Sequence, residues 1–383
     1  MYLKHLYLEN FRNYNEATLE LEQEINVFYG DNAQGKTNII EAIYFLALAK
    51  SHRTSKEKEL IKIGNSFSLV KGKVKHRNHE TKQEILLTPY GKKAKINNNE
   101  IKKISEYVGY LNVVIFSPED LNIVKGGPAY RRRFLDIEIG QINASYLYHL
   151  VQYQRVMQQR NNFLKELNVK IMGREDELTV WNAQLIEHGV KIILKRIQYI
   201  ELIGKWLQPI HTNISEDAEK LTIDYSCSLI ERDSMIEKRE FLSEANEEIL
   251  TELFITALQR YQRIEIIRGV TLVGPHRDDL IFNINEQNVL IYGSQGQQRT
   301  AALSLKLAEL ELINHYNGEY PILLLDDVLS ELDQRRQTFL LKGIENKVQT
   351  LLTTTTLAGI EGNQIKNKKI HYVENGKITK VGK

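Results

Sequence analysis

The sequence has a single cysteine, Cys227, among its 383 residues. An internal disulfide and a metal site built from cysteines are therefore both excluded. Long apolar stretches are also missing, because no apolar run reaches the roughly 18 to 20 residues that span a bilayer. The stretch Met1–Leu8 alternates like a strand and lacks the long apolar core of a signal peptide. From these absences we expect a soluble, cytosolic protein.

An excess of one charge sign is absent too. The 51 Lys and Arg residues are nearly balanced by 49 Asp and Glu residues, which leaves a formal net charge of +2. This excludes a uniformly basic nucleic-acid binder but allows a locally basic face. Three local clusters could contact phosphates without reading bases, namely Arg131–Arg133, Lys71–Arg77 and Lys92–Lys95. Each could equally be a solvated surface, and Asp136 and Glu138 could pair with the arginines.

Internal repeats and low-complexity tracts are absent, but the pattern of residue types along the chain changes twice. Both ends of the chain have the short apolar runs and turn signals of an α/β protein. The middle is amphipathic and poor in glycine, and long helices are expected over Ser145–Leu167 and Trp181–Leu207. We therefore expect two domains: an α/β head of residues 1–135 plus 270–383, and a mainly helical arm of residues 136–269 inserted into it.

One motif near the N-terminus predicts a phosphate-binding loop. It follows the apolar run Ile25–Tyr29 and precedes a segment with helical spacing, Asn38–Leu48. In such a loop the glycines let backbone N–H groups point at phosphates, Lys36 reaches the β and γ oxygens, and Thr37 offers its hydroxyl to Mg²⁺. We expect ATP to bind to the whole motif: Gly30, Asp31, Asn32, Ala33, Gln34, Gly35, Lys36 and Thr37.

A second motif, Ile322–Asp327, reads as a buried strand that ends in two acids. Ligands bind at the carboxyl ends of parallel strands. Asp326 would then support Mg²⁺, directly or through water, and Asp327 would polarise the attacking water as a catalytic residue beside Lys36. The alternative is an ordinary helix cap after a strand, which is common for Asp.

A third motif, Gly293–Arg299, precedes a predicted helix and contains Ser294, Gly296 and Gln297. A serine hydroxyl, a glycine backbone and a helix N-terminus together favour an anion. Because one chain binds one γ-phosphate in its own loop, a second anion site suggests contact with the nucleotide of a partner chain. The motif could also be a polar helix start with no ligand.

The order of the three motifs, with a long helical insertion between the first and the other two, resembles the ATPase heads of the ABC and SMC class. Further stretches are similar to the RecF family of bacterial recombination mediators: Asn10–Tyr14, Ser51–Thr54, Phe116–Leu121, Gly126–Asp136, Gly274–Asp279 and Leu325–Asp333. The resemblance extends from the first strand to about Thr356. It implies an α/β P-loop ATPase head of the ABC/SMC type with an inserted, mainly helical second domain.

The resemblance also implies a function. Such a protein is an ATP-dependent DNA-binding protein of recombinational repair, replication restart and the DNA damage (SOS) response. Two copies sandwich ATP as a homodimer on gapped or junction DNA, without sequence preference, and aid RecA loading together with RecO and RecR. The implied cofactors are ATP and Mg²⁺, the implied activity is a weak DNA-stimulated ATPase, and no membrane is involved. Ser294–Gln297 would be the signature acting on the partner's nucleotide, and Ser330–Asp333 would match the D-loop at the dimer interface.

The sequence departs from the ABC class at three places. Asp327 stands where a Glu is usual, and a carboxylate shorter by one methylene agrees with slow hydrolysis. Ser117 or Glu119 replaces the usual glutamine, and Thr353–Thr356 occupies the place of the usual switch histidine. The lone His276 lies among charged residues, and we interpret it as structural.

Two other classes remain as alternatives: an ABC-type transporter ATPase subunit and a P-loop small-molecule kinase or GTPase, both unrelated to DNA. The split head argues against the transporter subunit. A guanine-reading Asn-Lys-x-Asp element is missing from the sequence.

Overall fold

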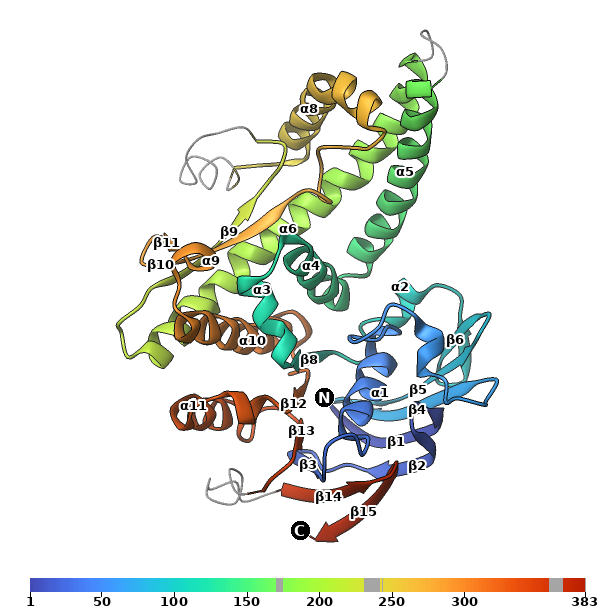
Figure 1. The fold of residues 1–383 in the computed structure, drawn as a ribbon, viewed down its shortest axis with the longest axis vertical. Coiled ribbons are helices and arrows are strands. Elements are labelled where there is room, and N and C mark those ends of the chain that lie inside the picture. Colours follow the sequence, from blue (N-terminus) through green and yellow to red (C-terminus); the bar gives the residue numbers. More distant parts are fainter. Residues whose placement is uncertain (170–174, 231–241, 243, 358–367, 383) are drawn as a thin grey trace. The chain divides into compact units, whose positions relative to one another are not determined.

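The computed structural model describes residues 1–169, 175–230, 242, 244–357 and 368–382 (Figure 1). Its contacts divide the chain into two compact units. The first unit contains Met1–Leu121, Asn213–Glu216 and Arg299–Lys383, and the second contains Asn122–Thr212 and Asp217–Gln298. The first unit thus combines both ends of the chain, as the α/β texture predicts.

The first unit contains a mainly parallel sheet of six strands in the order β15-β14-β3-β13-β12-β8. Only the edge strand β15 runs antiparallel to its neighbour. The inner strands β12 and β13 and the edge strand β8 are buried along their whole length, as expected for a parallel sheet covered on both faces. The strands are β3 Ile25–Tyr29, β8 Val113–Phe116, β12 Ile322–Asp326, β13 Thr350–Thr354, β14 Lys368–Glu374 and β15 Lys377–Gly382.

A second, antiparallel sheet of six strands has the order β2-β1-β4-β5-β6-β7. Buried and exposed side chains alternate along β5, so one face of this sheet is covered and the other is solvated. The strands are β1 Tyr2–Phe11, β2 Tyr14–Glu20, β4 Ser68–Lys75, β5 Glu80–Thr88, β6 Gly91–Ile96 and β7 Asn99–Ile101.

Helix α1 (Lys36–Leu48) packs against strands of both sheets, which explains why it is apolar almost all the way round. Strand β4 approaches it closely at Gly72, where a Cβ would lie 2.4 Å from the side chain of Leu46. Helix α1, which both sheets cover, begins at Lys36 within the phosphate-loop motif. The other helices of this unit are α2 Ile104–Tyr107 and α11 Gln334–Ile344, with 3₁₀ helices η1 Glu57–Leu60, η2 Pro118–Asp120 and η4 Val328–Glu331.

The second unit is mainly helical, with a three-stranded sheet in the order β11-β10-β9. The helices predicted over Ser145–Leu167 and Trp181–Leu207 are confirmed inside α5 and α6. Helix α6 continues past Pro209, because the flanking Leu207 and His211 are fully buried and hold the turn in place. The elements are α3 Leu121–Lys125, α4 Pro128–Ile142, α5 Ala144–Val169, η3 Glu175–Glu177, α6 Leu178–Ser215, β9 Leu221–Ser226, α8 Glu247–Arg268, β10 Asp279–Ile284, β11 Gln287–Asn288 and α9 Val289–Tyr292, followed by α10 Gln295–Asn317, which runs on into the first unit.

The compact units and the expected domains differ at three places. Asn213–Glu216 group with the first unit, whereas the sequence assigns them to the arm. Residues 122–135 and 270–298 group with the second unit, whereas the sequence assigns them to the head. The physical reason is that β10 pairs with β9 of the arm, and the Arg131 guanidinium joins α4 to β10 by donating to both carboxylate oxygens of Asp279, at 2.6 and 2.9 Å. The pairing of the arginines with Asp136 and Glu138 that the sequence suggested is not what Arg131 forms. The division into a head and an arm domain itself remains a prediction.

His276 is enclosed in the second unit. Its Nδ1 lies 2.8 Å from the Tyr153 hydroxyl and its Nε2 lies 3.1 Å from the Thr271 carbonyl oxygen. Burial lowers the pKa of His276 to about 4. These contacts support the structural interpretation of this histidine. No helix in the described ranges has the length and apolarity needed to cross a membrane.

Candidate nucleotide-binding site

The loop between β3 and α1 has a backbone that requires its glycines. Gly30 and Gly35 have φ of +154° and +115°, values that side-chain-bearing residues rarely adopt. A Cβ on Gly30 would lie 2.3 Å from the backbone oxygen of Val373, and one on Gly35 would lie 2.6 Å from the Asn13 amide. The predicted phosphate loop is therefore a tight turn in which neither glycine can carry a side chain.

Lys36, the first residue of α1, folds back over this loop. Its ammonium donates to the carbonyl oxygens of Gly30 and Asp31, both at 2.8 Å. Burial lowers the pKa of Lys36, whereas the carboxylates of Asp327, Asp31 and Asp326 act in the opposite direction. The loop thus holds a cation at the place where the motif predicts the β and γ phosphates, within the field of both acids from the second motif.

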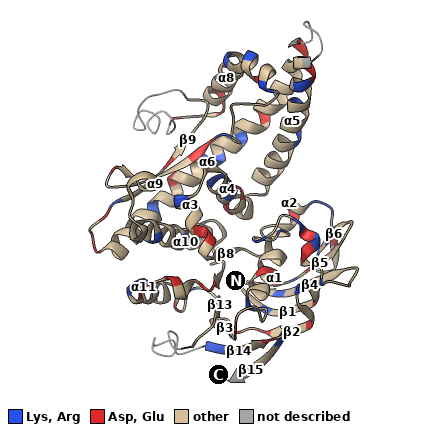
Figure 2. Ribbon diagram, in the orientation of Figure 1, with Lys and Arg blue, Asp and Glu red and all other residues tan. Residues whose placement is uncertain are grey.

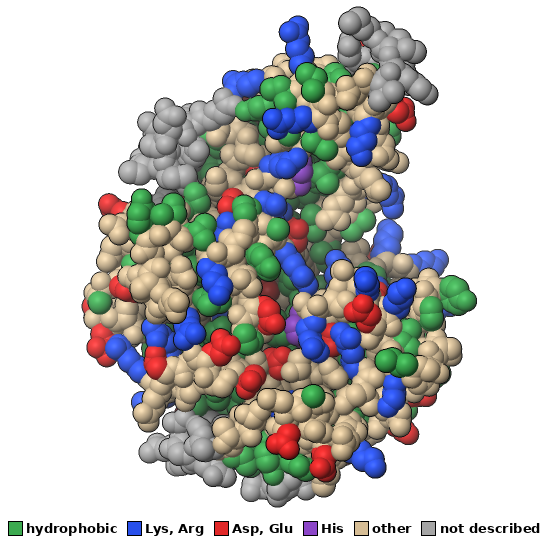
Figure 3. All heavy atoms as spheres, in the orientation of Figure 1, with side chains coloured by type: hydrophobic (Ala, Val, Ile, Leu, Met, Phe, Trp, Pro, Cys, Tyr) green, Lys and Arg blue, Asp and Glu red, His purple; other side chains and the backbone are tan. Residues whose placement is uncertain are grey.

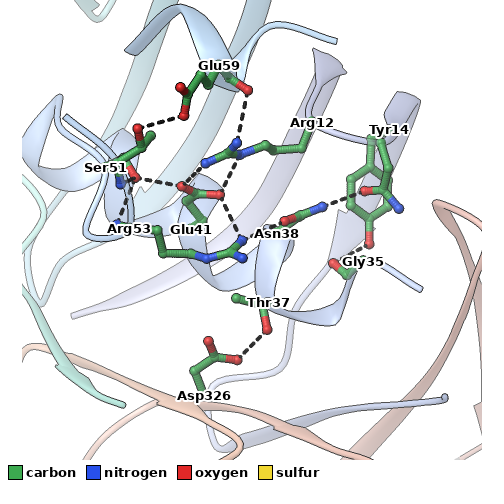
Figure 4. Close-up of polar contacts among 12 residues, drawn as sticks. Arg12, Tyr14, Gly35, Thr37, Asn38, Glu41, Ser51, Arg53, Glu59 and Asp326 are labelled. Carbon is green, nitrogen blue, oxygen red and sulfur yellow. Dashed lines mark hydrogen bonds and ion pairs between the residues drawn. The ribbon is translucent and has the colours of Figure 1, made fainter. Parts of the chain in front are cut away.

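Thr37 and Asp326 are 289 residues apart in the chain and in direct contact. The Thr37 hydroxyl donates to Oδ1 of Asp326 at 2.8 Å (Figure 4). Burial raises the pKa of Asp326, against the hydrogen bonds from Thr353 and Thr37. A hydroxyl and a carboxylate oxygen side by side are the ligand types with which proteins hold Mg²⁺ beside phosphates. The residues present therefore fit the predicted metal.

Thr353 links the two acids, a role that the sequence did not reveal. It is the last residue but one of β13 and lies opposite Asp326 in the register with β12. Its hydroxyl donates to Oδ1 of Asp326 at 2.8 Å and accepts the backbone N–H of Asp327 at 2.9 Å. Asp327 has a left-handed backbone, with φ of 54°, which is uncommon outside glycine. The hydroxyl of Thr353 thus holds the sharp turn that follows β12.

A buried carboxylate braces the helix behind the loop. Glu41, which has no exposed side-chain surface, accepts two hydrogen bonds from Arg12, at 2.7 and 2.8 Å, and one from Ser51 at 2.6 Å. Arg53 lies 3.5 Å from the same carboxylate and donates to Asn38 at 3.1 Å (Figure 4). Burial by itself raises the pKa of Glu41. The hydrogen bonds from Arg12 and Ser51 outweigh this effect and hold the pKa below its usual value.

The brace continues to the loop backbone. Asn38 donates to Asn13 at 2.8 Å, Asn13 donates to the Gln34 carbonyl oxygen at 3.0 Å, and the Tyr14 hydroxyl donates to the Gly35 carbonyl oxygen at 3.0 Å. The sequence marked the stretches Asn10–Tyr14 and Ser51–Thr54 by family resemblance alone, and their supporting role was missed. The sequence did offer one signal for this role, because Glu41 is the single acid in the otherwise mainly apolar helix α1.

Ser117 and Glu119 were the two candidates for the missing glutamine. Ser117 caps the short helix η2, and both its backbone N–H and its hydroxyl donate to Asp120, at 2.7 and 3.1 Å. Glu119 instead interacts electrostatically with Asp326 and raises its pKa. Which of the two replaces the glutamine stays a prediction. Ser294, Gly296 and Gln297 belong to the second unit, and their contact with a nucleotide stays a prediction.

Comparisons with known proteins agree with these motifs. The model of the RecF/RecN/SMC N terminal domain matches residues 2–379. The DNA replication and repair protein RecF of Bacillus cereus (strain G9842) is 50% identical over 378 residues, which cover 99% of this chain and 98% of that protein. RecF of Bacillus thuringiensis (strain Al Hakam) has the same identity and coverage.

Two solved structures of the recombination mediator protein RecF in the RecFOR pathway, described as RecF-ATPrS and RecF-ATP, are 36% identical to this chain. Their TM-scores are 0.90 and 0.89, over 100% of this chain and 98% of each of theirs. An Smc head bound to the C-winged helix domain of ScpA has a TM-score of 0.56 at 15% identity, over 100% of this chain and 98% of that one, and shares the fold. The expected SMC-type ATPase head fold is therefore confirmed.

The brace around Glu41 leads to a prediction about pH. Because the folded-state pKa of Glu41 lies below the ordinary value of 4.5, its charge stabilises the fold fully above that pH. This contribution is lost as the pH falls through the folded-state pKa. We expect Glu41→Gln to lower the free energy of unfolding by about 1 to 3 kcal/mol at neutral pH and by less at acidic pH. Urea unfolding between neutral and acidic pH measures both.

Glu252→Gln is the matched control, because Glu252 is exposed on α8. It should change the free energy of unfolding by no more than about 0.5 kcal/mol. A Glu41→Gln variant with the wild-type pH profile would show that the carboxylate contributes nothing to the brace.

Proposed function

Because this chain belongs to the RecF family of DNA replication and repair proteins, we propose that it is an ATP-dependent DNA-binding protein of recombinational repair whose two copies close around ATP. The observation that carries the proposal is the contact between Thr37 and Asp326 at the base of the glycine turn. It brings the predicted phosphate loop and the predicted metal residue into one site. The full-length similarity to RecF proteins disfavours the transporter subunit and the small-molecule kinase.

Each residue of the first unit would have a distinct task in ATP hydrolysis. The backbone of Gly30–Gly35 and the ammonium of Lys36 bind the phosphates. Thr37 and Asp326 would hold Mg²⁺, which would neutralise charge on the phosphate oxygens. Asp327 orients and polarises the attacking water. Its carboxylate is one methylene shorter than the usual Glu, which agrees with a weak ATPase.

The signature residues supply the reason for a dimer. Ser294, Gly296 and Gln297 would bind the γ-phosphate held by a second copy, so that ATP joins two chains and hydrolysis releases them. We further propose that this dimer acts on gapped or junction DNA, where DNA stimulates its ATPase. It would aid RecA loading there together with RecO and RecR. The relatives solved in the RecFOR pathway support this placement.

The dimer is tested by measuring molecular mass in solution with and without ATP and Mg²⁺. We expect the wild-type chain to shift from monomer to dimer with ATP. Lys36→Ala removes the loop cation and should remain monomeric. A wild-type chain that stays monomeric with ATP and DNA present would exclude the sandwich mechanism.

The role of Asp327 is tested with Asp327→Asn, which keeps the size of the side chain but removes its negative charge. We expect ATP binding to persist, hydrolysis to fall by about 100-fold or more, and closed dimers to accumulate. Nucleotide binding, phosphate release and molecular mass are measured on the same sample. Loss of ATP binding in this variant would contradict the assignment of Asp327 to the water.

The basic clusters differ in what they offer to DNA. Arg131 is buried and committed to Asp279, so its cluster is partly structural. The lysines of β4 and β6 lie on the antiparallel sheet (Figure 2), where Lys95 pairs with Glu84 at 3.3 Å. Over this part of the surface basic and acidic side chains are interspersed (Figure 3). A groove of about 420 Å³ is lined there by His5, Tyr7, Lys71, Lys73, Lys82 and Lys95.

We propose this lysine groove as a contact for the DNA backbone. The double variant Lys82→Glu with Lys95→Glu should weaken binding to all DNA sequences alike. It should also reduce the slope of log affinity against log salt by about one for each lysine. The control is Lys342→Glu with Lys347→Glu, which has the same change in charge on and beside α11. Equal losses in both double variants would show that only the net charge matters.

A further inference from the structure

The signature motif lies in a loop that its own residues shape. Gly293 must be a glycine, because a Cβ there would lie 2.5 Å from the backbone oxygen of Val289. Ser294 and Gln297 form a reciprocal cap at the start of α10. The Ser294 backbone N–H donates to Oε1 of Gln297 at 2.8 Å, and the Gln297 backbone N–H donates to the Ser294 hydroxyl at 3.2 Å. The Gln297 side chain is thus part of the loop itself.

The nitrogen of the same Gln297 amide reaches a carboxylate from a distant part of the second unit. Its Nε2 donates to Oε1 of Glu219 at 2.9 Å, across 78 residues of sequence. The second carboxylate oxygen of Glu219 lies 3.1 Å from Nε2 of His211. His211 is fully buried on α6. A continuous chain of hydrogen bonds therefore joins the signature to the interior of the unit.

The protonation of this chain follows from its geometry. Burial lowers the pKa of His211, and the hydrogen bond with Glu219 acts in the opposite direction. A neutral imidazole facing an ionised carboxylate must present its N–H, so Nε2 carries the proton. Both oxygens of Glu219 thus have donors, and the carboxylate orients the Gln297 amide with its oxygen towards Ser294.

We propose that Glu219, backed by His211, is a positioning residue that holds the signature in the conformation that binds the partner's γ-phosphate. The inference rests on the proposed ATP-bound dimer and adds to it a residue outside every motif of the sequence. A partly exposed glutamine retains rotamer freedom, which costs free energy when it must be ordered at the moment of binding. Glu219 removes that freedom in advance, as preorganised sites require.

The same carboxylate could act in the opposite way. A negative charge near the N-terminus of α10 is itself favoured by the helix dipole and could compete with a phosphate for that position. If Glu219 positions the signature, loss of its carboxylate lowers ATP hydrolysis. If it competes with the phosphate, the same loss raises hydrolysis, so one set of variants separates the two roles.

The first test compares Glu219→Ala, Glu219→Gln and the exposed control Glu252→Ala. ATP affinity of the phosphate loop, ATP-dependent dimerisation and ATP hydrolysis are measured. We expect Glu219→Ala to leave the loop affinity unchanged and to lower hydrolysis and dimerisation about tenfold or more. Glu219→Gln keeps an oxygen that can accept from Gln297 and should recover most of the activity. Wild-type or faster hydrolysis by Glu219→Ala overturns the proposal.

The second test asks whether the effect acts across the dimer. Glu219→Ala and Asp327→Asn chains are mixed before ATP is added. A mixed dimer then has one complete site, formed by the loop of the Glu219→Ala chain and the signature of the Asp327→Asn chain. Hydrolysis should rise above that of either variant alone, to at most about a quarter of the wild-type rate for equal mixing of chains in a two-fold dimer.

The outcomes of the mixing test are distinct. No gain in hydrolysis on mixing, while the wild-type chain dimerises with ATP, overturns the role of Glu219 and leaves the proposed function standing. A wild-type chain that stays monomeric with ATP overturns the proposed function, and the role of Glu219 falls with it.

Discussion

The candidate site depends on the order of strands in the parallel sheet. Strand β13 lies between β3, which leads into the glycine turn, and β12, which ends at Asp326. Because these strands are parallel and in register, their carboxyl ends meet at one edge, and Thr353 faces Asp326 there. A hydroxyl at this one position can satisfy the buried carboxylate and the backbone of the next residue together.

The buried carboxylate of Glu41 is the second constraint. Helix α1 packs between two sheets and has no solvated face, so an acid within it needs partners. Arg12 comes from the turn between β1 and β2 of the antiparallel sheet, and Ser51 and Arg53 come from the loop that follows α1. The requirement to neutralise one charge thus ties the helix, the loop and the sheet together behind the glycine turn. Rigidity of that kind is what a phosphate-binding loop needs in order to present its backbone N–H groups.

In the second unit, buried charge again determines the architecture. Arg160 pairs with Glu265 at 2.6 Å, and neither side chain has any exposed surface. Arg196 pairs with Asp136 at 2.8 Å and donates to the Pro275 carbonyl oxygen at 2.6 Å. The stretch Gly274–Asp279 is held by Arg196 at Pro275 and by Tyr225 and Ser228 at Asp278. His276 lies in the same stretch and contacts Tyr153 and Thr271, which agrees with its structural interpretation.

The sequence by itself determined the features that rest on local chemistry. The glycines at 30 and 35, the apolar strand that ends in Asp326 and Asp327, and the long amphipathic helices are each legible because turn geometry and side-chain periodicity act over a few residues. The full order of motifs was enough for the family and the fold class.

Only the tertiary structure decided which distant groups meet. It paired Arg131 with Asp279, placed Thr353 between the two acids and joined Gln297 to Glu219. In each case the partners come from separate elements, and many acids or hydroxyls along the chain could have served equally well. A buried charge or polar group pairs with whichever partner lies close to it. Which partner is close depends on the packing of the whole unit, and a local sequence pattern does not contain that information.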